Sequence, residues 1–348
     1  MKQIRLEKIA DTVTRGESRN SAIARLNGFW EVFSKDDNVL VVINADPDAL
    51  AAAMAVKRLL RYRVQNVTIG YPNEIRRLNN LEMVKRLKIS IERLHTLKIS
   101  DYTKKVLLDS QPPHLPCFEK VHFDAVIDHH PITVQWDAKF IDIRPAYGAA
   151  SSIMVEYLRA ANIKPSVALA TALFYGIKVD TQNFEKNALP ADGISFRYLF
   201  SLANLNLVRK LELTDLRRSE LKYFKIALNE LKVSKGKAFV HVGRVWSPDI
   251  LVIIADFLNH VDQFSWVIVS GIHGERMVVI FRCDGYRKNA GIFAQKIFSK
   301  YGVAGGHKQA ARAEMPVKNL EIPDNQEVTT QTLIKLATRH EKLMASQK

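Results

Sequence analysis

The sequence predicts a two-domain α/β protein, in which a larger N-terminal domain with a parallel sheet is joined by a linker helix to a smaller α+β domain. The chain has 348 residues, more than one average domain contains. Through the first half, short apolar runs alternate with helical segments, which is the pattern of βαβ units. Beyond about residue 212, longer strand-like runs lie between helical segments and predict a second, α+β domain.

The N-terminal half contains the elements of the predicted parallel sheet. Apolar residues at helical spacing predict a helix within residues 5–35. Short runs that are apolar on both faces are typical of buried parallel strands. These predicted strands span residues 39–43, 66–71, 105–108 and 125–127, and the helices predicted around them span residues 49–60, 149–161 and 166–177.

The C-terminal part changes in character. A charged connecting helix is predicted over 214–231, and a glycine-rich stretch follows at 302–308. Strands are predicted at 238–245 and within 264–283, and helices at 250–260 and 290–301. The predicted domains are therefore 1–212, a linker helix at 213–235, a second domain at 236–320 and a polar helical tail at 321–348.

The balance of charge points to a polyanionic partner. The chain has 51 Lys and Arg against 36 Asp and Glu, a net charge of +15, and nucleic acid is the commonest partner of such a surplus. An anionic membrane surface is the alternative, but no basic amphipathic helix supports it. The N-terminus lacks the apolar core of a signal peptide, no run of 18 apolar residues occurs, and Cys117 and Cys283 form no CxxC motif. These features predict a cytoplasmic protein with reduced thiols.

Ionisable residues follow the ends of several predicted elements. The carboxyl ends of parallel strands meet at one edge, which is where open α/β sheets bind ligands. Carboxylates gathered there would repel each other unless cations neutralised them. Oxygen ligands with one or two imidazoles suit Mn²⁺ or Mg²⁺, and paired ions activate water against phosphoesters. The residues concerned are Asp46, Asp48, Asp109, Asp128, His129, His130 and Asp180.

Each of these motifs also has a purely structural interpretation. Asp46 and Asp48 flank Pro47 and would serve as turn and N-cap residues of the following helix. Asp180 fits a turn that ends a helix. A His-His pair after a buried strand is uncommon without a metal, and the order and spacing of all the motifs together favour the metal interpretation.

The motifs resemble a known series. ADPDALAAA (45–53), VLLDS (106–110), VIDHHP (126–131), YGAASS (147–152) and GIKVDT (176–181) are similar, in order, to the motifs of the DHH phosphoesterases. This family includes RecJ-like exonucleases and NrnA-like oligoribonucleases. AGGHKQAARA (304–313) is similar to the GGH motif of the DHH-associated C-terminal domain. The resemblance covers about residues 20–320.

The resemblance implies a role for each matching residue. Asp46 would bind one ion and Asp48 the other, Asp109 would bridge both, and His129 and Asp180 would complete the second site. His130 would lie beside the substrate phosphate, with Asp128 orienting a histidine of the pair. The residues that would hold the substrate from the second domain are Arg282, Gly305, Gly306 and His307.

One position departs from the family pattern. Many members have a metal-ligating histidine four residues before the first aspartate, and here that position is Val42. Asn44 is the nearest polar candidate, but an amide oxygen is a neutral and weaker ligand. We therefore expect the first of the two metal sites to be weak.

The resemblance implies a phosphoesterase that uses two Mn²⁺ or Mg²⁺ ions to cut short RNA or DNA oligonucleotides to mononucleotides. The alternatives are a phosphodiesterase for cyclic dinucleotides or phosphoadenosine phosphate, and a catalytically weakened protein that binds nucleic acid or nucleotides. Between Lys57 and Lys105 there are 13 Lys and Arg against 4 Asp and Glu. These form either solvated helix faces or a basic rim that draws polyanions to the site. No membrane partner is expected, and a homodimer is compatible with the sequence.

Overall fold

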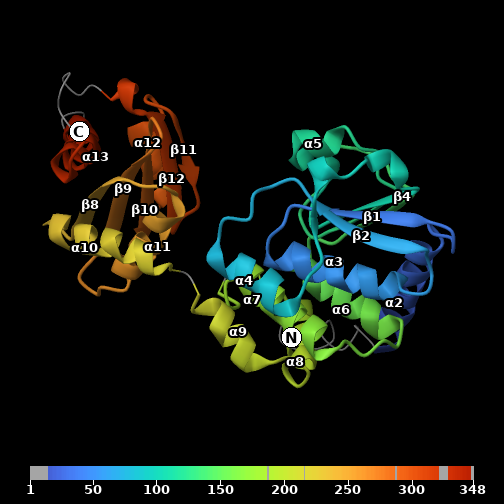
Figure 1. Cartoon of the computed structure of the whole chain (residues 1–348). Coiled ribbons are helices and arrows are strands. Elements are labelled where there is room, and N and C mark those ends of the chain that lie inside the picture. The colour runs from blue at the N-terminus through green and yellow to red at the C-terminus, as the bar shows by residue number, and fades with distance from the viewer. Residues whose placement is uncertain (1–14, 186–187, 215, 287, 321–327, 346–348) are drawn as a thin grey trace, which may run out of the picture. The chain divides into compact units, whose positions relative to one another are not determined.

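The computed structural model describes residues 15–185, 188–214, 216–286, 288–320 and 328–345 (Figure 1). The chain divides into two compact units, Met1–Thr214 and Asp215–Lys348. The predicted fold class is confirmed, because each unit is built on its own sheet and the first sheet is parallel.

The first sheet has six strands in the order β3-β2-β1-β4-β5-β6. All neighbouring strands in it are parallel, so their carboxyl ends lie along one edge. The strands are β1 (Asn38–Ile43), β2 (Asn66–Tyr71), β3 (Glu92–Arg93), β4 (Lys104–Leu108), β5 (Ala125–Asp128) and β6 (Phe140–Ile143). β3 and β6 were not predicted from the sequence. β3 has only two residues, and β6 carries Asp142, which is buried beside Arg144 and breaks the apolar pattern.

Helices cover one face of this sheet, and a shorter segment covers the other. Figure 1 shows α2, α3 and α6 on one side of the strands and α5 on the opposite side. The helices of the unit are α2 (Arg15–Trp30), α3 (Pro47–Leu60), α4 (Leu78–Leu87), α5 (Pro116–Glu119), α6 (Ala150–Ala160), α7 (Val167–Asp180), α8 (Pro190–Phe200) and α9 (Leu205–Glu212). The predicted first helix was longer than α2, but residues 5–14 of it lie outside the described residues.

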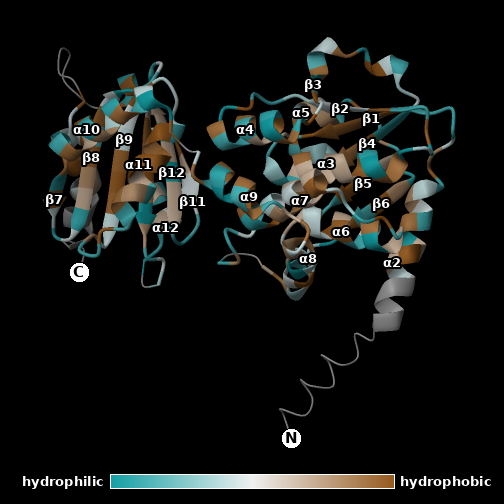
Figure 2. Ribbon diagram, turned by 60° about the horizontal axis from the view of Figure 1, so that its bottom comes forward, coloured by the Kyte–Doolittle hydropathy of each residue, from teal (hydrophilic) through white to brown (hydrophobic). Residues whose placement is uncertain are grey.

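The burial of the central strand β1 on both faces explains why its sequence is continuously apolar. Val39, Val41 and Ile43 belong to the large core on the side of the helices, whereas Leu40 and Val42 belong to the apolar cluster on the side of α5. Successive side chains of a strand point to opposite faces, so a strand buried on both faces must be continuously apolar. Figure 2 shows this hydrophobic colouring along the strands of both sheets.

The second unit is a mixed sheet with helices on both faces. Its order is β11-β12-β10-β9-β8-β7, and only β8 and β9 pair in parallel among its described strands. The strands are β7 (Lys232–Ser234), β8 (Lys237–Arg244), β9 (Trp266–His273), β10 (Arg276–Cys283), β11 (Val303–Gly306) and β12 (Ala310–Pro316). The helices are α10 (Leu221–Glu230), α11 (Asp249–Asn259), α12 (Ala290–Phe298) and α13 (Thr330–Ala345).

The predicted linker helix is divided. A short 3-10 turn, η4 (Arg218–Glu220), precedes α10, and residue 215 lies outside the described residues. Tyr223 and Ala227 of α10 are buried in one core with Ala238 and Val240 of β8. This helix therefore packs as part of the second unit. α13 lies within the predicted C-terminal tail, and residues 321–327 and 346–348 of that tail lie outside the described residues.

Along the described residues, no helix combines the length and the apolar character that crossing a membrane requires.

Close packing of α7 on α3 depends on a glycine. A Cβ atom at Gly176 would lie 2.5 Å from Ser151 Oγ and 3.1 Å from the Cα of Asp48. Gly176 therefore allows α7 to approach the start of α3, where a predicted metal ligand lies.

We expect Gly176→Ala to lower the free energy of unfolding by about 1–3 kcal/mol, because the added methyl group must displace the backbone of α3 or α7. The matched control is Gly193→Ala in α8, where a Cβ atom would meet nothing within 4 Å. Helix propensity alone should make that control neutral or stabilising. Urea denaturation of both variants measures the difference, and equal stabilities would contradict the packing argument.

Candidate metal centre

Asp109 follows β4, near the middle of the sheet edge. Its backbone has a φ of +53°, and its N–H donates to the carbonyl of Ile127 on β5. Aspartate is one of the few residues other than glycine that adopts this left-handed conformation readily. The side chain is buried and lies beside the end of β5.

The end of β5 supplies an aspartate and two histidines. Asp128 is fully buried, and its Oδ1 accepts from the backbone N–H of His129 and from His130 Nδ1, each at 2.8 Å. Its Oδ2 accepts from Gln111 Nε2 at 2.8 Å. Burial alone would raise the pKa of Asp128, but these hydrogen bonds outweigh it and hold the pKa below its usual value. Asp128 therefore remains a carboxylate that orients His130.

His129 points its two ring nitrogens in different directions. Nδ1 lies 3.2 Å from the carbonyl oxygen of Tyr147. Since only a protonated Nδ1 can donate to a carbonyl, the lone pair of neutral His129 is on Nε2. That Nε2 lies 3.2 Å from Asp109 Oδ1 and 3.2 Å from Asp180 Oδ2. This is the orientation of a metal-ligating histidine held by its other nitrogen.

The two aspartates that flank Pro47 differ in what they bind. Asp46 is the N-cap of α3, and its side chain accepts from the N–H of Ala49. Asp48 is buried, and its two oxygens accept from the N–H groups of Ala150 and Ser151 at the start of α6. The N-cap interpretation is therefore correct for Asp46, although it does not exclude a second role for the carboxylate.

The cluster concentrates more negative charge than a buried site tolerates. Burial and the nearby Asp180 raise the pKa of Asp46 to about 6 and that of Asp48 to about 7. Burial and the charges of Asp48 and Asp46 raise the pKa of Asp109 well above its usual value. Against the effect of its own burial, Asp109 and Asp180 raise the pKa of His129 to about 12. The group thus requires protons or cations to neutralise it.

The polar atoms of the cluster fit a divalent cation. One set of close ligand atoms comes from Asp109, Asp128, His129 and His130, and another from Asp48, His129 and Asp180; within each set they lie within 4.8 Å of one another. Among the described residues, Asp109 Oδ1 and His129 Nε2 are buried and have no hydrogen-bond partner of good geometry beyond the 3.2 Å contacts that His129 makes with Asp109 and Asp180. Buried polar atoms are otherwise almost always satisfied, so these two are open to an ion.

Two further residues from the sequence analysis lie near the end of β1. Asn44 is half-buried in the loop that leads from β1 to Asp46. Val42 is only 1% exposed and packs in the apolar cluster with Leu107 and Val126. An apolar environment surrounds the position where the family resemblance implies a histidine.

Three residues support the cluster in ways that the sequence did not predict, although one of them, Tyr147, begins the YGAASS motif. Gln111 is buried, and its Nε2 donates to His130 O as well as to Asp128. Asn73 accepts from Ala45 N at 2.8 Å and donates to Ala45 O at 3.1 Å, which fixes the loop before Asp46. Tyr147 supplies the carbonyl for His129. A single amide or tyrosine has no spacing signature, so only the structure identifies them.

A buried charge network holds Tyr147. Its hydroxyl donates to Glu156 at 2.5 Å, and Arg144 Nη1 donates to both Glu156 (2.7 Å) and the Tyr147 hydroxyl (3.3 Å). Arg144 also pairs with Asp142, which accepts from the hydroxyl of Tyr157. Glu156 and Arg144 therefore hold the hydroxyl end of Tyr147, and this fixes the residue whose carbonyl orients His129.

The residues predicted to hold substrate lie in the second unit. Arg282 is on β10 and pairs with Asp256 of α11 at 2.6 Å. Gly306 ends β11, and a Cβ atom there would lie 2.4 Å from Ala310 O. The carbonyl of His307 accepts from the N–H of Gly291 in α12. Gly305 pairs with Arg312 in the same hairpin. Close packing against β12 is thus one reason for Gly306, whereas a Cβ atom at Gly305 would lie no closer than 3.7 Å to Gln295 Nε2, and substrate binding here stays a prediction.

The fold and the cluster together define an α/β protein with a candidate metal centre at the carboxyl edge of a parallel sheet. The family model described as "DHH family, N-terminal domain" matches residues 38–177. Residues 38–177 therefore match the N-terminal domain of the DHH family, which confirms for this part of the chain the resemblance noted in the sequence.

Relatives and solved structures extend this similarity beyond the matched domain. An uncharacterized protein from Methanocaldococcus jannaschii is 32% identical over 280 residues, which is 80% of this chain but only 58% of that protein. An exopolyphosphatase-related protein from Bacteroides fragilis has a similar fold, with a TM-score of 0.65 and 15% identity over 92% of this chain and 98% of its own. RecJ from Thermus thermophilus, solved in complex with Mn²⁺, has a TM-score of 0.50 and 13% identity over 93% of this chain and 55% of its own.

We expect Asp109→Asn to remove high-affinity Mn²⁺ binding while leaving the fold intact, because asparagine tolerates the positive φ but carries no charge. The control is Asp124→Asn, which removes a buried carboxylate paired with Lys104. Calorimetric titration with MnCl₂ measures the affinity, and circular dichroism reports the fold. Unchanged Mn²⁺ affinity in Asp109→Asn would rule out a metal centre at this residue.

We expect Tyr147→Phe to weaken Mn²⁺ binding by about tenfold, because losing the hydroxyl frees the residue whose carbonyl orients His129. Tyr157→Phe is the matched control, since it also removes a buried hydroxyl from the network but one that donates to Asp142. The same titration compares the two variants. Equal losses would mean that the network acts only through general stability.

Proposed function

We propose that the chain is a metal-dependent phosphoesterase that hydrolyses phosphodiester bonds in short oligonucleotides. The observation that carries this proposal is the carboxylate and imidazole cluster at the sheet edge. In it, the buried Asp109 Oδ1 and His129 Nε2 lie 3.2 Å apart and have, among the described residues, no other hydrogen-bond partner of good geometry. Such a set of oxygen and nitrogen ligands suits a divalent cation, Mn²⁺ or Mg²⁺.

The residues of the cluster would have different roles in metal binding and in hydrolysis. Asp46, Asp48, Asp109, His129 and Asp180, with Asn44 as a weaker neutral donor, would hold the cations. When bound, the cations would polarise the phosphoryl group and make water more acidic. His130 is exposed beside them, and its Nδ1 is held by Asp128, so its Nε2 is free to exchange a proton or hydrogen-bond with a phosphate oxygen. Arg282, Gly305, Gly306 and His307 are proposed to contact substrate from the second unit.

The proposed substrate class rests on charge. The surplus of +15, with 13 Lys and Arg between residues 57 and 105, favours a ligand with several phosphates over a small neutral one. The similarity of fold to a RecJ solved with Mn²⁺ supports the same class of substrate and ion.

Hydrolysis of a substrate panel in the presence of Mn²⁺ tests the proposal. The panel contains a diribonucleotide, pentanucleotides of RNA and DNA, a cyclic dinucleotide, phosphoadenosine phosphate and pyrophosphate. We expect mononucleotide release from the short oligonucleotides, loss of that release with EDTA, and no release by Asp109→Asn. Preference for the cyclic dinucleotide or phosphoadenosine phosphate would replace the proposed substrate.

One observation favours a second candidate, a nucleotide-binding protein with weak or no hydrolysis. Val42 lies in an apolar cluster at the position where the resemblance implies a histidine ligand. Tight binding of the pentanucleotide without product release, at saturating Mn²⁺, would select this candidate over the enzyme.

A further inference from the structure

The carboxyl edge of the first sheet continues beyond the metal cluster to β2 and β3. Tyr71 is the last residue of β2 and Arg93 the last of β3, and the two are direct partners in the sheet. Because all six strands are parallel, both lie on the same edge as Asp46. β3 is two strands away from β1 and three away from β4, which Asp109 follows, so its end lies about 10 Å from the end of β1 and about 14 Å from that of β4.

The side chain of Arg93 is held in place but, as far as the described residues go, makes no ion pair. Its guanidinium carbon lies 5.1 Å from the centroid of the Tyr71 ring, and Nη1 donates to the carbonyl of Asn73 at 3.0 Å. Among the residues that the structure describes, no carboxylate pairs with this half-buried group. A guanidinium has five N–H donors, so most of them stay available to a ligand.

Asn73 connects this arginine to the candidate metal centre. Its backbone carbonyl accepts from Arg93, while its side-chain amide pairs with both polar groups of the Ala45 backbone, one residue before Asp46. The guanidinium and the metal-binding loop are therefore fixed by the same residue. This is the kind of rigid support that a binding site requires.

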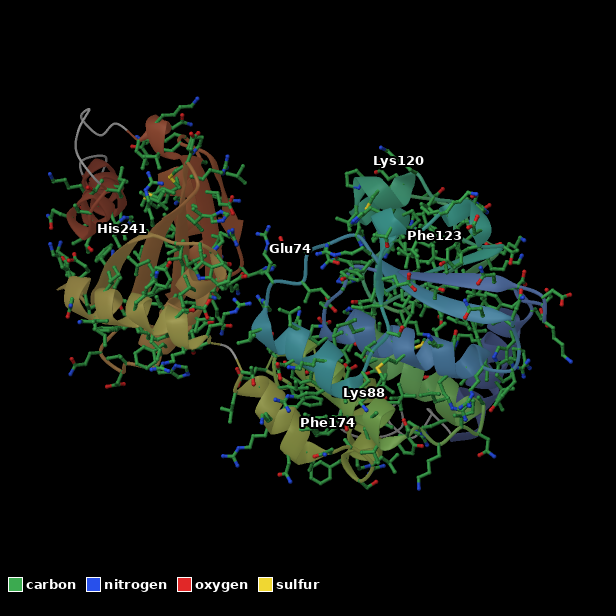
Figure 3. The ribbon with its side chains drawn as sticks, in the orientation of Figure 1. Glu74, Lys88, Lys120, Phe123, Phe174 and His241 are labelled. Atoms are coloured by element: carbon green, nitrogen blue, oxygen red, sulfur yellow. The ribbon has the colours of Figure 1, made fainter. Side chains whose placement is uncertain are left out.

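The neighbouring charges do not compete for Arg93. Glu74 follows Asn73 on the loop after β2 (Figure 3), and its carboxylate pairs with Arg76 at 2.7 Å. Arg77 is exposed on the same loop. The local charge around Arg93 is thus positive, beside a cluster that cations would neutralise.

We propose that Arg93, seated on Tyr71, binds a phosphate of the substrate other than the one that reacts at the metal cluster. The strand ends of β3 and β4 are about 14 Å apart, which exceeds the size of one phosphate group, so the two centres would hold different phosphates of one chain. Planar guanidinium groups bind phosphate with two parallel hydrogen bonds. The ligand class is a nucleic acid strand with at least two phosphates, and the inference rests on the proposed function.

The opposite edge of the sheet offers a matched control. Arg63 precedes β2, and its guanidinium carbon lies 3.4 Å from the centroid of the Trp30 ring. Arg63→Ala and Arg93→Ala each remove one positive charge and one cation–π contact. Only Arg93 lies on the edge that carries the acidic cluster.

The first measurement is the binding of a fluorescently labelled pentaribonucleotide in EDTA, where hydrolysis cannot occur. We expect Arg93→Ala to weaken binding by about tenfold and to lower the slope of log K against log salt by about 1, because one phosphate contact is lost. Arg93→Lys should retain part of the affinity, and Arg63→Ala should match the wild type. Equal affinities for Arg93→Ala and Arg63→Ala would overturn the proposal.

The second measurement is steady-state hydrolysis with Mn²⁺. We expect Arg93→Ala to raise KM for the pentaribonucleotide about tenfold with kcat little changed, and to leave hydrolysis of bis(p-nitrophenyl) phosphate, which has one phosphate, unaffected. An equal effect on both substrates would contradict a second phosphate site. If the wild type hydrolyses neither substrate, the proposed function fails, and the binding measurement still decides the role of Arg93.

Discussion

The need to stabilise buried negative charge determines how the polar side chains of the N-terminal unit are arranged. Carboxylates at the sheet edge are removed from water, and each needs a donor or a cation to remain in the folded state. Asp48 receives the first N–H groups of α6, Asp46 receives an N–H of its own helix, and Asp128 receives Gln111 and His129. The N–H groups at the helix N-termini and the buried amide of Gln111 therefore stabilise the same group of negative charges. Among the described residues, the buried Asp109 Oδ1 receives no such donor and instead lies 3.2 Å from His129 Nε2.

The parallel sheet makes this concentration of charge feasible. Strands that run in one direction bring residues distant in sequence to one edge, and the apolar run of β1 anchors that edge in the core. Gly176 lets α7 approach closely enough for its last residue, Asp180, to reach His129 at 3.2 Å. Packing in the helical layer thus sets the geometry of the polar site, and the two cannot be varied separately.

Much of this arrangement could be predicted from the sequence because it depends on local patterns. Short runs rich in apolar and β-branched residues predicted β1, β2, β4 and β5. Of the acidic and histidine residues that follow them, those that lie among the close ligand atoms are Asp48, Asp109, Asp128, His129 and His130. β6 was missed because Asp142 interrupts its apolar pattern, and the burial of Asp142 depends on the hydroxyl of Tyr157 in α6 as well as on the nearby Arg144. Gln111 and Asn73 were missed for the same reason, since their importance comes from partners that the fold alone brings together.

The left-handed backbone at Asp109 has a consequence for how the protein can vary over evolution. Glutamate is usually the mildest replacement for aspartate, since it preserves the charge, yet its side chain does not favour a φ of +53°. Asparagine and glycine fit the backbone but discard the charge. Every single substitution at this position therefore either strains the main chain or removes the carboxylate. Where selection maintains the charge, no replacement of Asp109 is free of cost.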